Sequence, residues 1–367
     1  MNALLLYYLV FFSTFLLFSI EYHSQVKITA GRKKSNLRNV IKSFIFLSIA
    51  LVPVFIILVN RYMVGTDYGN YMRMYNDCIK YDYINYEYGI VTLFKISDAI
   101  GWEFKGFLFL AALLGINLST VAIKRQCSPR YFPVAVLIYL FIYFGPACNI
   151  MAQVIAVSFA ILAYEQMIKK NLKLYVIFCL LGSLFHLAIL IIIPVYWAYN
   201  LEGKTRTRFV STSIIVLMGL FTLYPSIISG ILNGIGLAKY SHYLQYLQYD
   251  KIKTFSFLLL YRSPLIILEL LYRRKIVAQS KHNQLYYFLV VLEIASCILG
   301  IGIPWAGRLA YFFSVTHVFL VAKILEVTKN GNERLIVGII IVAYFVIAFY
   351  MIHFFSEFDD IMVYQFA

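Results

Sequence analysis

The sequence predicts an all-α polytopic membrane protein with about twelve transmembrane helices and both termini on the external side. The first reason is composition. The chain is 62% hydrophobic and 13% charged, and a soluble domain of 367 residues cannot bury that much apolar surface. The second reason is charge distribution. The Lys and Arg residues behind the net charge of +15 gather in short segments between apolar runs, as in cytoplasmic turns. We therefore expect one integral membrane domain over residues 1–367 and no nucleic acid partner.

The basic segments order the apolar runs. Six of them are assigned to the cytoplasm: 27–38, 124–130, 169–173, 204–208, 273–281 and 329–334. An even number of helices must cross the membrane between consecutive cytoplasmic segments. This parity predicts helices at 2–20, 40–60, 104–123, 131–147 and 149–168, two short helices within 174–203, and helices at 209–231, 255–272, 284–303, 304–325 and 335–355.

Residues 61–103 fall outside the membrane in this scheme, as an external amphipathic or re-entrant segment. Within it, residues 88–100 are too few and too charged to span a bilayer, which predicts a helix lying at or partly inside the membrane surface. Residues 131–168 form a helical hairpin, and Gly145 and Pro146 predict its turn. The polar residues Asn149 and Gln153 then lie at its external tip.

The apolar run 174–203 lies between two basic segments, so it must cross the membrane twice or not at all. We predict two short helices that meet near His186. The alternative is one tilted helix kinked at Pro194. A lone histidine within an apolar run is expensive to bury in a bilayer, which makes His186 a functional candidate. No internal repeat is visible, which argues against a transporter built from duplicated halves.

The external segment supplies further candidates. Asp67 and Glu87 are carboxylates able to act as general bases, and Arg73 lies on the same helical stretch as Asp67. The alternative for Asp67 is an ordinary helix cap, and the many tyrosines nearby are also typical of an interfacial aromatic belt. Farther along, Tyr243 and Tyr246 belong to a tyrosine stripe with steps of three residues, which suits either a membrane anchor or the wall of a cleft.

Arg262 and Arg308 lie in apolar surroundings, where an unpaired arginine costs roughly 2.5 to 3.5 kcal/mol on insertion scales. A guanidinium binds phosphate in a bidentate manner, so both are candidates for holding a diphosphate. The alternatives are snorkelling or a structural pair with Glu293 or Glu269. His317 and His353 are predicted to be packing or interfacial residues.

The sequence gives no indication of chemistry that depends on a metal or a nucleotide. The histidines occur one per segment, the five cysteines are scattered, and no metal-binding or nucleotide-binding motif is present. We therefore expect neither a metal nor a cofactor.

The sequence resembles the EpsG/Wzy-type polysaccharide polymerases of bacterial membranes. The resemblance rests on short motifs in the family's order, which together cover most of the chain. They are Gly65-Thr66-Asp67 with Asn70-Tyr71, Tyr86-Glu87-Tyr88-Gly89, Gln153-x-Ile155-Ala156 with the lysine turn after it, Phe185-His186, and Arg308-Leu309-Ala310-Tyr311-Phe312.

This resemblance implies a GT-C-like membrane glycosyltransferase that joins undecaprenyl-diphosphate-linked repeat units at the outer leaflet of the bacterial plasma membrane. Asp67 or His186 would take the proton of the acceptor hydroxyl. A second set of residues would bind the substrate and its diphosphate: Arg73, Glu87, Asn149, Gln153, Arg262 and Arg308. The sugars would stack on Tyr68, Tyr71, Tyr243 and Tyr246. Expected partners are the lipid-linked glycan, membrane lipid and a chain-length regulator protein.

One position departs from the family pattern, which commonly has arginine directly before the glutamine. Here Ala152 precedes Gln153. Either the phosphate-binding charge has moved to Arg262 and Arg308, or the chain is an inactivated variant.

Two other functions remain as alternatives, a lipid-linked oligosaccharide flippase and an integral membrane acyltransferase that modifies glycans. A flippase needs a charged cavity open to both leaflets, whereas these candidate charges map to the outer half. An acyltransferase would be expected to carry its histidine near a cytoplasmic donor, whereas His186 maps outside.

Overall fold

The computed structural model describes residues 2–28, 45–82, 86–201, 251–302, 307–355 and 359–366. These residues form helices joined by turns, with one isolated bridge between Arg61 and Phe366 and no strand. Seven of the described helices are long and apolar enough to cross a membrane. The described part of the chain is therefore all-helical, and the chain is a polytopic membrane protein, as expected. The total of about twelve spans and the side of each terminus stay predictions. The predicted helix 209–231 and the Tyr243 and Tyr246 stripe lie outside the described residues.

The chain divides into two compact units, and a single domain over the whole chain also stays a prediction. The first unit holds residues 1–190 and 321–367, and the second holds residues 191–320. The helices of the first unit are α1 (Ala3–Ile28), α3 (Val52–Val59), α4 (Tyr68–Tyr81), α5 (Tyr88–Ala99), α6 (Glu103–Ala112), η2 (Leu113–Asn117), α7 (Leu118–Gln126), α8 (Phe132–Asn149), α9 (Met151–Ile168), α10 (Leu172–Ser183), α20 (Gly331–Tyr350) and η6 (Met351–Phe355).

The second unit contains α11 (Ile193–Asn200), α15 (Lys251–Gln279), η5 (Lys281–Asn283), α16 (Gln284–Gly302) and α18 (Ala310–Ser314). Two elements run across the boundary between the units, η3 (Leu187–Ile192) and α19 (Thr316–Val327).

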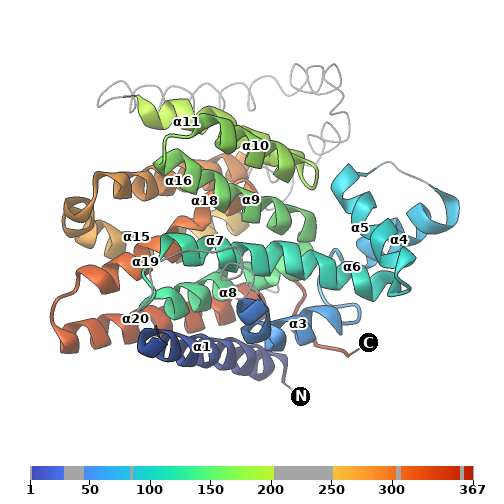
Figure 1. The fold of residues 1–367 in the computed structure, drawn as a ribbon, viewed down its shortest axis with the longest axis horizontal. Coiled ribbons are helices and arrows are strands. Elements are labelled where there is room, and N and C mark those ends of the chain that lie inside the picture. Colours follow the sequence, from blue (N-terminus) through green and yellow to red (C-terminus); the bar gives the residue numbers. More distant parts are fainter. Residues whose placement is uncertain are drawn as a thin grey trace. The chain divides into compact units, whose positions relative to one another are not determined.

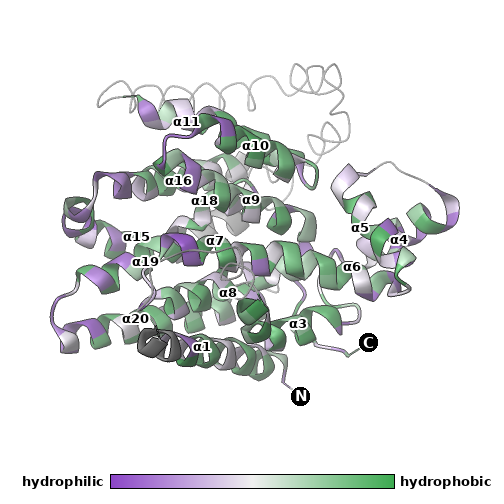
Figure 2. Ribbon diagram, in the orientation of Figure 1, coloured by the Kyte–Doolittle hydropathy of each residue, from purple (hydrophilic) through white to green (hydrophobic). Residues whose placement is uncertain are grey.

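The core of the first unit is built around α8, which is apolar and buried along almost its whole length. Helices α1 and α20, from opposite ends of the chain, lie beside it (Figure 1). Phe11 of α1 packs edge-on against Phe144 of α8 at 5.0 Å and against Phe349 of α20 at 5.3 Å. Figure 2 shows α8 hydrophobic over most of its length and α4 much more mixed.

The turn of the 131–168 hairpin is not where the sequence predicted it. Helix α8 continues through Gly145 and Pro146 to Asn149, and α9 begins at Met151. The carbonyls of this last turn have partners, because Ile150 N–H donates to Pro146 O at 2.8 Å and the Asn149 amide donates to Gly145 O at 3.1 Å. Glycine at 145 serves a different purpose. A Cβ there would collide with His353 and Asp359.

The predicted break near His186 is confirmed. Helix α10 ends at Ser183, residues 184–186 are not helical, and a 3₁₀ segment then leads into α11. Pro194 lies in the first turn of α11, where its missing N–H costs nothing, so the alternative of one helix kinked at Pro194 is wrong. Residues 61–103 contain the short helices α4 and α5, and α5 agrees with the short helix predicted at 88–100.

Candidate functional site

The first motif of the 61–103 segment, Gly65-Thr66-Asp67, lies against the end of α8. Gly65 has φ of +98°, a conformation that favours glycine. A Cβ at this position would lie 2.7 Å from Cys148 O and 2.8 Å from Asn149 Oδ1. Thr66 donates a hydrogen bond from its hydroxyl to Asn149 Oδ1 at 2.9 Å. The glycine and the threonine therefore have structural explanations, and both involve Asn149.

Asp67 has no such explanation. It is the N-terminal flanking residue of α4, but its side chain makes no capping hydrogen bond. The carboxylate is half-buried, so solvent or a ligand can reach it. A helix cap was the alternative to a functional role, and the capping bond that this alternative requires is absent.

The tip of the hairpin contacts α4 through the next motif residue, Tyr71. Its hydroxyl accepts a hydrogen bond from Ala152 N–H at 3.1 Å, which satisfies one of the free N–H groups at the start of α9. Gln153 is 1% exposed and Ala152 is 7% exposed. Ala152 is thus a buried residue at the start of α9, in contact with α4.

The second and fourth motifs also meet. Gly89 N–H donates to Leu184 O at 2.7 Å, so the start of α5 binds the non-helical segment that carries His186. A Cβ on Gly89 would lie 2.7 Å from both Leu184 O and the Phe185 ring. Glu87, two residues before this glycine, is half-buried at the N-terminal end of α5. His186 is half-buried too, and its Nδ1 accepts a hydrogen bond from Ala188 N–H at 3.3 Å.

All four of these motifs surround one hydrophobic cluster of the first unit. Its buried members come from α4, α5, α6 and α9, and Phe185 and Tyr86 pack against it. Segments that are far apart in the sequence therefore converge on one region, which we define as the candidate site. Its residues are Asp67, Glu87, Asn149, Gln153 and His186.

Two tyrosines predicted to stack on sugars lie inside this cluster. Tyr68 is 3% exposed and packs edge-on against Phe104, and Tyr71 is 9% exposed and stacks on Phe107. Burial raises the pKa of the Tyr68 phenol, which therefore stays neutral. These contacts favour a structural role for both rings, and their sugar contacts stay predictions.

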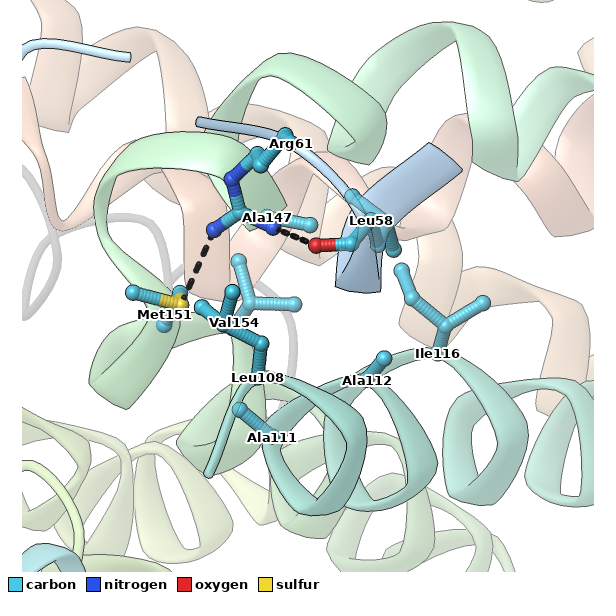
Figure 3. A pocket seen from close by; sticks show the side chains of 9 residues that line it. All are labelled: Leu58, Arg61, Leu108, Ala111, Ala112, Ile116, Ala147, Met151 and Val154. Carbon is cyan, nitrogen blue, oxygen red and sulfur yellow. Dashed lines mark hydrogen bonds between the residues drawn. The ribbon is translucent and has the colours of Figure 1, made fainter. Parts of the chain in front are cut away.

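Arg61 is a site residue that the sequence reasoning missed. Its side chain is buried and donates hydrogen bonds to Leu58 O at the end of α3 and to Cys148 O, and it contacts Met151 Sδ at 3.1 Å (Figure 3). No carboxylate among the described residues pairs with it, and its Nε is buried without a hydrogen bond. The guanidinium borders a small cavity whose other walls are Leu58, Leu108, Ala111, Ala112, Ile116, Ala147, Met151 and Val154. The sequence signal that could have identified Arg61 is its position directly after the apolar run 40–60.

The C-terminal segment was missed as well. Residues 359–366 lie along the segment that contains Gly65, with Asp360 O accepting from Gly65 N–H at 3.0 Å and Gln365 O accepting from Tyr62 N–H at 2.9 Å. Asp359 O accepts a 2.9 Å hydrogen bond from the Asn149 amide, and its carboxylate lies 3.0 Å from His353 Nδ1. His353 is therefore a buried partner of a carboxylate and not an ordinary packing residue.

The second unit contains the predicted arginines. Arg262 of α15 forms an ion pair with Glu293 of α16 and donates to Ser314 Oγ at 3.0 Å, so the pair with Glu293 that the sequence offered as an alternative is present. His317 of α19 lies 2.7 Å from both Glu269 and Glu293, which corrects its prediction as a packing residue. Arg308, just before α18, is exposed, as is Arg73 of α4 in the first unit.

Among the residues that the structure describes, no group of three or more His, Cys, Asp or Glu side chains is placed to hold a metal ion.

A sequence model of the EpsG family matches residues 44–366, a range that includes every described residue of the candidate site. Searches of curated proteins and of solved structures each found no match.

Proposed function

Because the chain belongs to the EpsG family of polysaccharide polymerase-type membrane proteins, we propose that it is a glycosyltransferase that polymerises undecaprenyl-diphosphate-linked repeat units. It works at the outer leaflet of the bacterial plasma membrane, with its active site facing the exterior and without a metal or cofactor. Its partners are the lipid-linked glycans, membrane lipid and a chain-length regulator protein.

The convergence of the sequence motifs carries this proposal. Gly65 and Thr66 contact the Asn149 end of α8, Tyr71 contacts Ala152, and Gly89 contacts the segment before His186. Motifs that served only packing would be expected to have structural partners for each polar member. Asp67 has no capping bond and remains accessible, which favours a chemical role for it.

The reaction breaks the bond between the anomeric carbon of the donor sugar and its lipid diphosphate, and it forms a bond from that carbon to an acceptor hydroxyl oxygen. The hydroxyl proton goes to a base, and the diphosphate leaves as an anion. A neutral His186 whose Nδ1 accepts from Ala188 N–H carries its proton on Nε2, so its other edge is a donor. This favours Asp67 as the base and His186 as a hydrogen-bond donor to the substrate.

The leaving diphosphate needs cationic partners, because negative charge develops on it as the bond breaks. Arg262 and Arg308 supply them in this proposal, and Arg73, Glu87, Asn149 and Gln153 place the glycan. Ala152 is then compatible with activity, since the phosphate-binding charge lies elsewhere in the chain.

The experiment replaces Asp67 by asparagine, which keeps size and hydrogen bonding but removes the base. We expect polymerisation to fall by about a hundredfold or more. In cells, single repeat units should accumulate on lipid, whereas a lost flippase displays no units and a lost acyltransferase leaves chains of full length. Gel separation of the polysaccharide measures all three outcomes.

The matched control is Asp82→Asn on the same external segment. Asp82 is exposed, has φ of +49° and pairs with Lys95 at 3.3 Å in an exposed contact of small energy. Asparagine tolerates this backbone conformation, so full-length chains should persist. Normal chain length in Asp67→Asn, or in both His186→Ala and Arg308→Ala, would contradict the proposal.

A further inference from the structure

Four side chains of the second unit form a buried ionisable cluster, which we name the Arg262 cluster after its most accessible member. Its members are Arg262 and Glu269 of α15, Glu293 of α16 and His317 of α19. Glu269, Glu293 and His317 are each at most 2% exposed, whereas the Arg262 side chain is 14% exposed. Charges buried this deeply are rarely retained without a purpose.

His317 lies between the two carboxylates. Its Nδ1 forms a 2.7 Å hydrogen bond with Glu269 Oε1, and its Nε2 lies 2.7 Å from Glu293 Oε2 without hydrogen-bond alignment. The other oxygen of Glu293 pairs with Arg262 and accepts a 2.9 Å hydrogen bond from the Ser314 hydroxyl. Glu293 thus connects the imidazole to the guanidinium.

These close contacts favour a proton in the cluster beyond the one that a neutral imidazole carries. A neutral ring has one N–H and one lone pair, and a lone pair 2.7 Å from a carboxylate oxygen is repulsive. Charge balance agrees. With a neutral ring, two carboxylates face one guanidinium and leave an uncompensated negative charge in a buried site, which is costly. An imidazolium removes both problems.

The other titratable or charged groups that the structure describes next to this cluster do not supply this balance. Tyr287 of α16 donates its hydroxyl proton to the backbone oxygen of Glu269 at 3.0 Å. The Arg273 guanidinium lies 5.7 Å from the centre of the Tyr287 ring and forms no ion pair with a described residue of the cluster.

We propose that His317 is an imidazolium and acts as a positioning residue that keeps Arg262 competent to bind an anionic diphosphate. This inference rests on the proposed function, in which Arg262 contacts the lipid diphosphate. Its Nη1 is occupied by Glu293 and Ser314, while its other nitrogens bond to no described residue and are available to a ligand. With His317 uncharged, the cluster is net negative and repels a diphosphate.

The first test is a double-mutant cycle on the purified full chain, with binding of farnesyl diphosphate as the readout. His317→Gln should weaken binding about tenfold. Adding Glu269→Gln to it removes one negative charge and should restore the affinity. Glu269→Gln alone should bind at least as tightly as the unchanged protein. If His317 served only packing, the losses of binding free energy in the two single variants would add up in the double variant. Failure of Glu269→Gln to restore binding would therefore overturn the proposal.

The second test observes the proton directly. In the ¹⁵N spectrum of histidine-labelled protein at pH 7, His317 should show two protonated ring nitrogens. The signal is identified by its disappearance in His317→Gln. The control His282→Gln, at an exposed position of η5 in the same unit, should remove a different signal and leave binding unchanged. A neutral His317 would overturn this inference while leaving polymerisation intact. Absence of polymer with normal probe binding would contradict the proposed function alone.

Discussion

At the scale of single residues, Gly65 fixes the backbone that precedes the proposed base. Gly65→Ala should lower the free energy of unfolding by about 1 to 3 kcal/mol, because alanine is strained at positive φ and its Cβ would press on Cys148 O. Thermal unfolding in detergent measures the loss. Polymerisation should fall as well, since Asp67 lies two residues away.

The matched control for this prediction is Gly101→Ala. Gly101 also has positive φ, at +72°, but a Cβ there meets no atom within 4 Å. It therefore carries the backbone strain without the collision. Equal losses in the two variants would show that the close approach of Gly65 to α8 contributes nothing to stability.

Part of the candidate site was predictable from residue types alone. Asp67 and His186 were identified because a motif or an apolar context made them unusual, and the pairing of Arg262 with Glu293 was foreseen as an alternative. The position of His317 between two carboxylates was not predicted, since Glu269 is 48 residues away along the chain. Contacts of this kind depend on which helix faces pack together, and hydropathy and charge clusters do not contain that information.

At the scale of elements, the C-terminal segment stabilises the region of the candidate site. Tyr364 donates its hydroxyl proton to Ile57 O of α3 at 2.9 Å, and the ring is packed against Phe366. Tyr364→Phe keeps the ring and removes this hydrogen bond, so we expect a loss of about 1 kcal/mol in stability. The same thermal unfolding assay measures it.

Val363→Ala is the control for that prediction, because the Val363 side chain is 65% exposed and its truncation should change stability by less than about 0.5 kcal/mol. If Tyr364→Phe were equally silent, the attachment of this segment would not depend on the Tyr364 hydroxyl.

The helices themselves were largely predictable, and the exceptions have a physical cause. The inward helix predicted at 149–168 is α9, at Met151–Ile168, and the break near His186 is present. The turn at Gly145 and Pro146 was wrong because glycine and proline are local signals. Here the Asn149 side chain closes the last turn of α8, and glycine at 145 makes room for His353 and Asp359, more than 200 residues away.

At the scale of the whole molecule, the side of the membrane on which each segment lies decides where the reaction occurs. The charge pattern predicts that residues 61–103 are external and that the turn at 169–173 is cytoplasmic. Asp67 and Lys170 therefore mark opposite sides of the bilayer in this scheme. A reaction at the outer leaflet requires that residues 61–103 are external.

This topology is tested by attaching a membrane-impermeant maleimide to single cysteines in intact cells. Cysteine in place of Tyr81, which is 75% exposed at the end of α4, should react from outside. Cysteine in place of the exposed Lys170 should react only after the membrane is permeabilised. The native Cys127 is replaced by serine in both variants, because it is partly exposed and could itself react with the maleimide. The other four native cysteines are buried, and they serve as the internal background. Reversed labelling would place Asp67 on the cytoplasmic side, where a polymerase using externally displayed lipid-linked units cannot act.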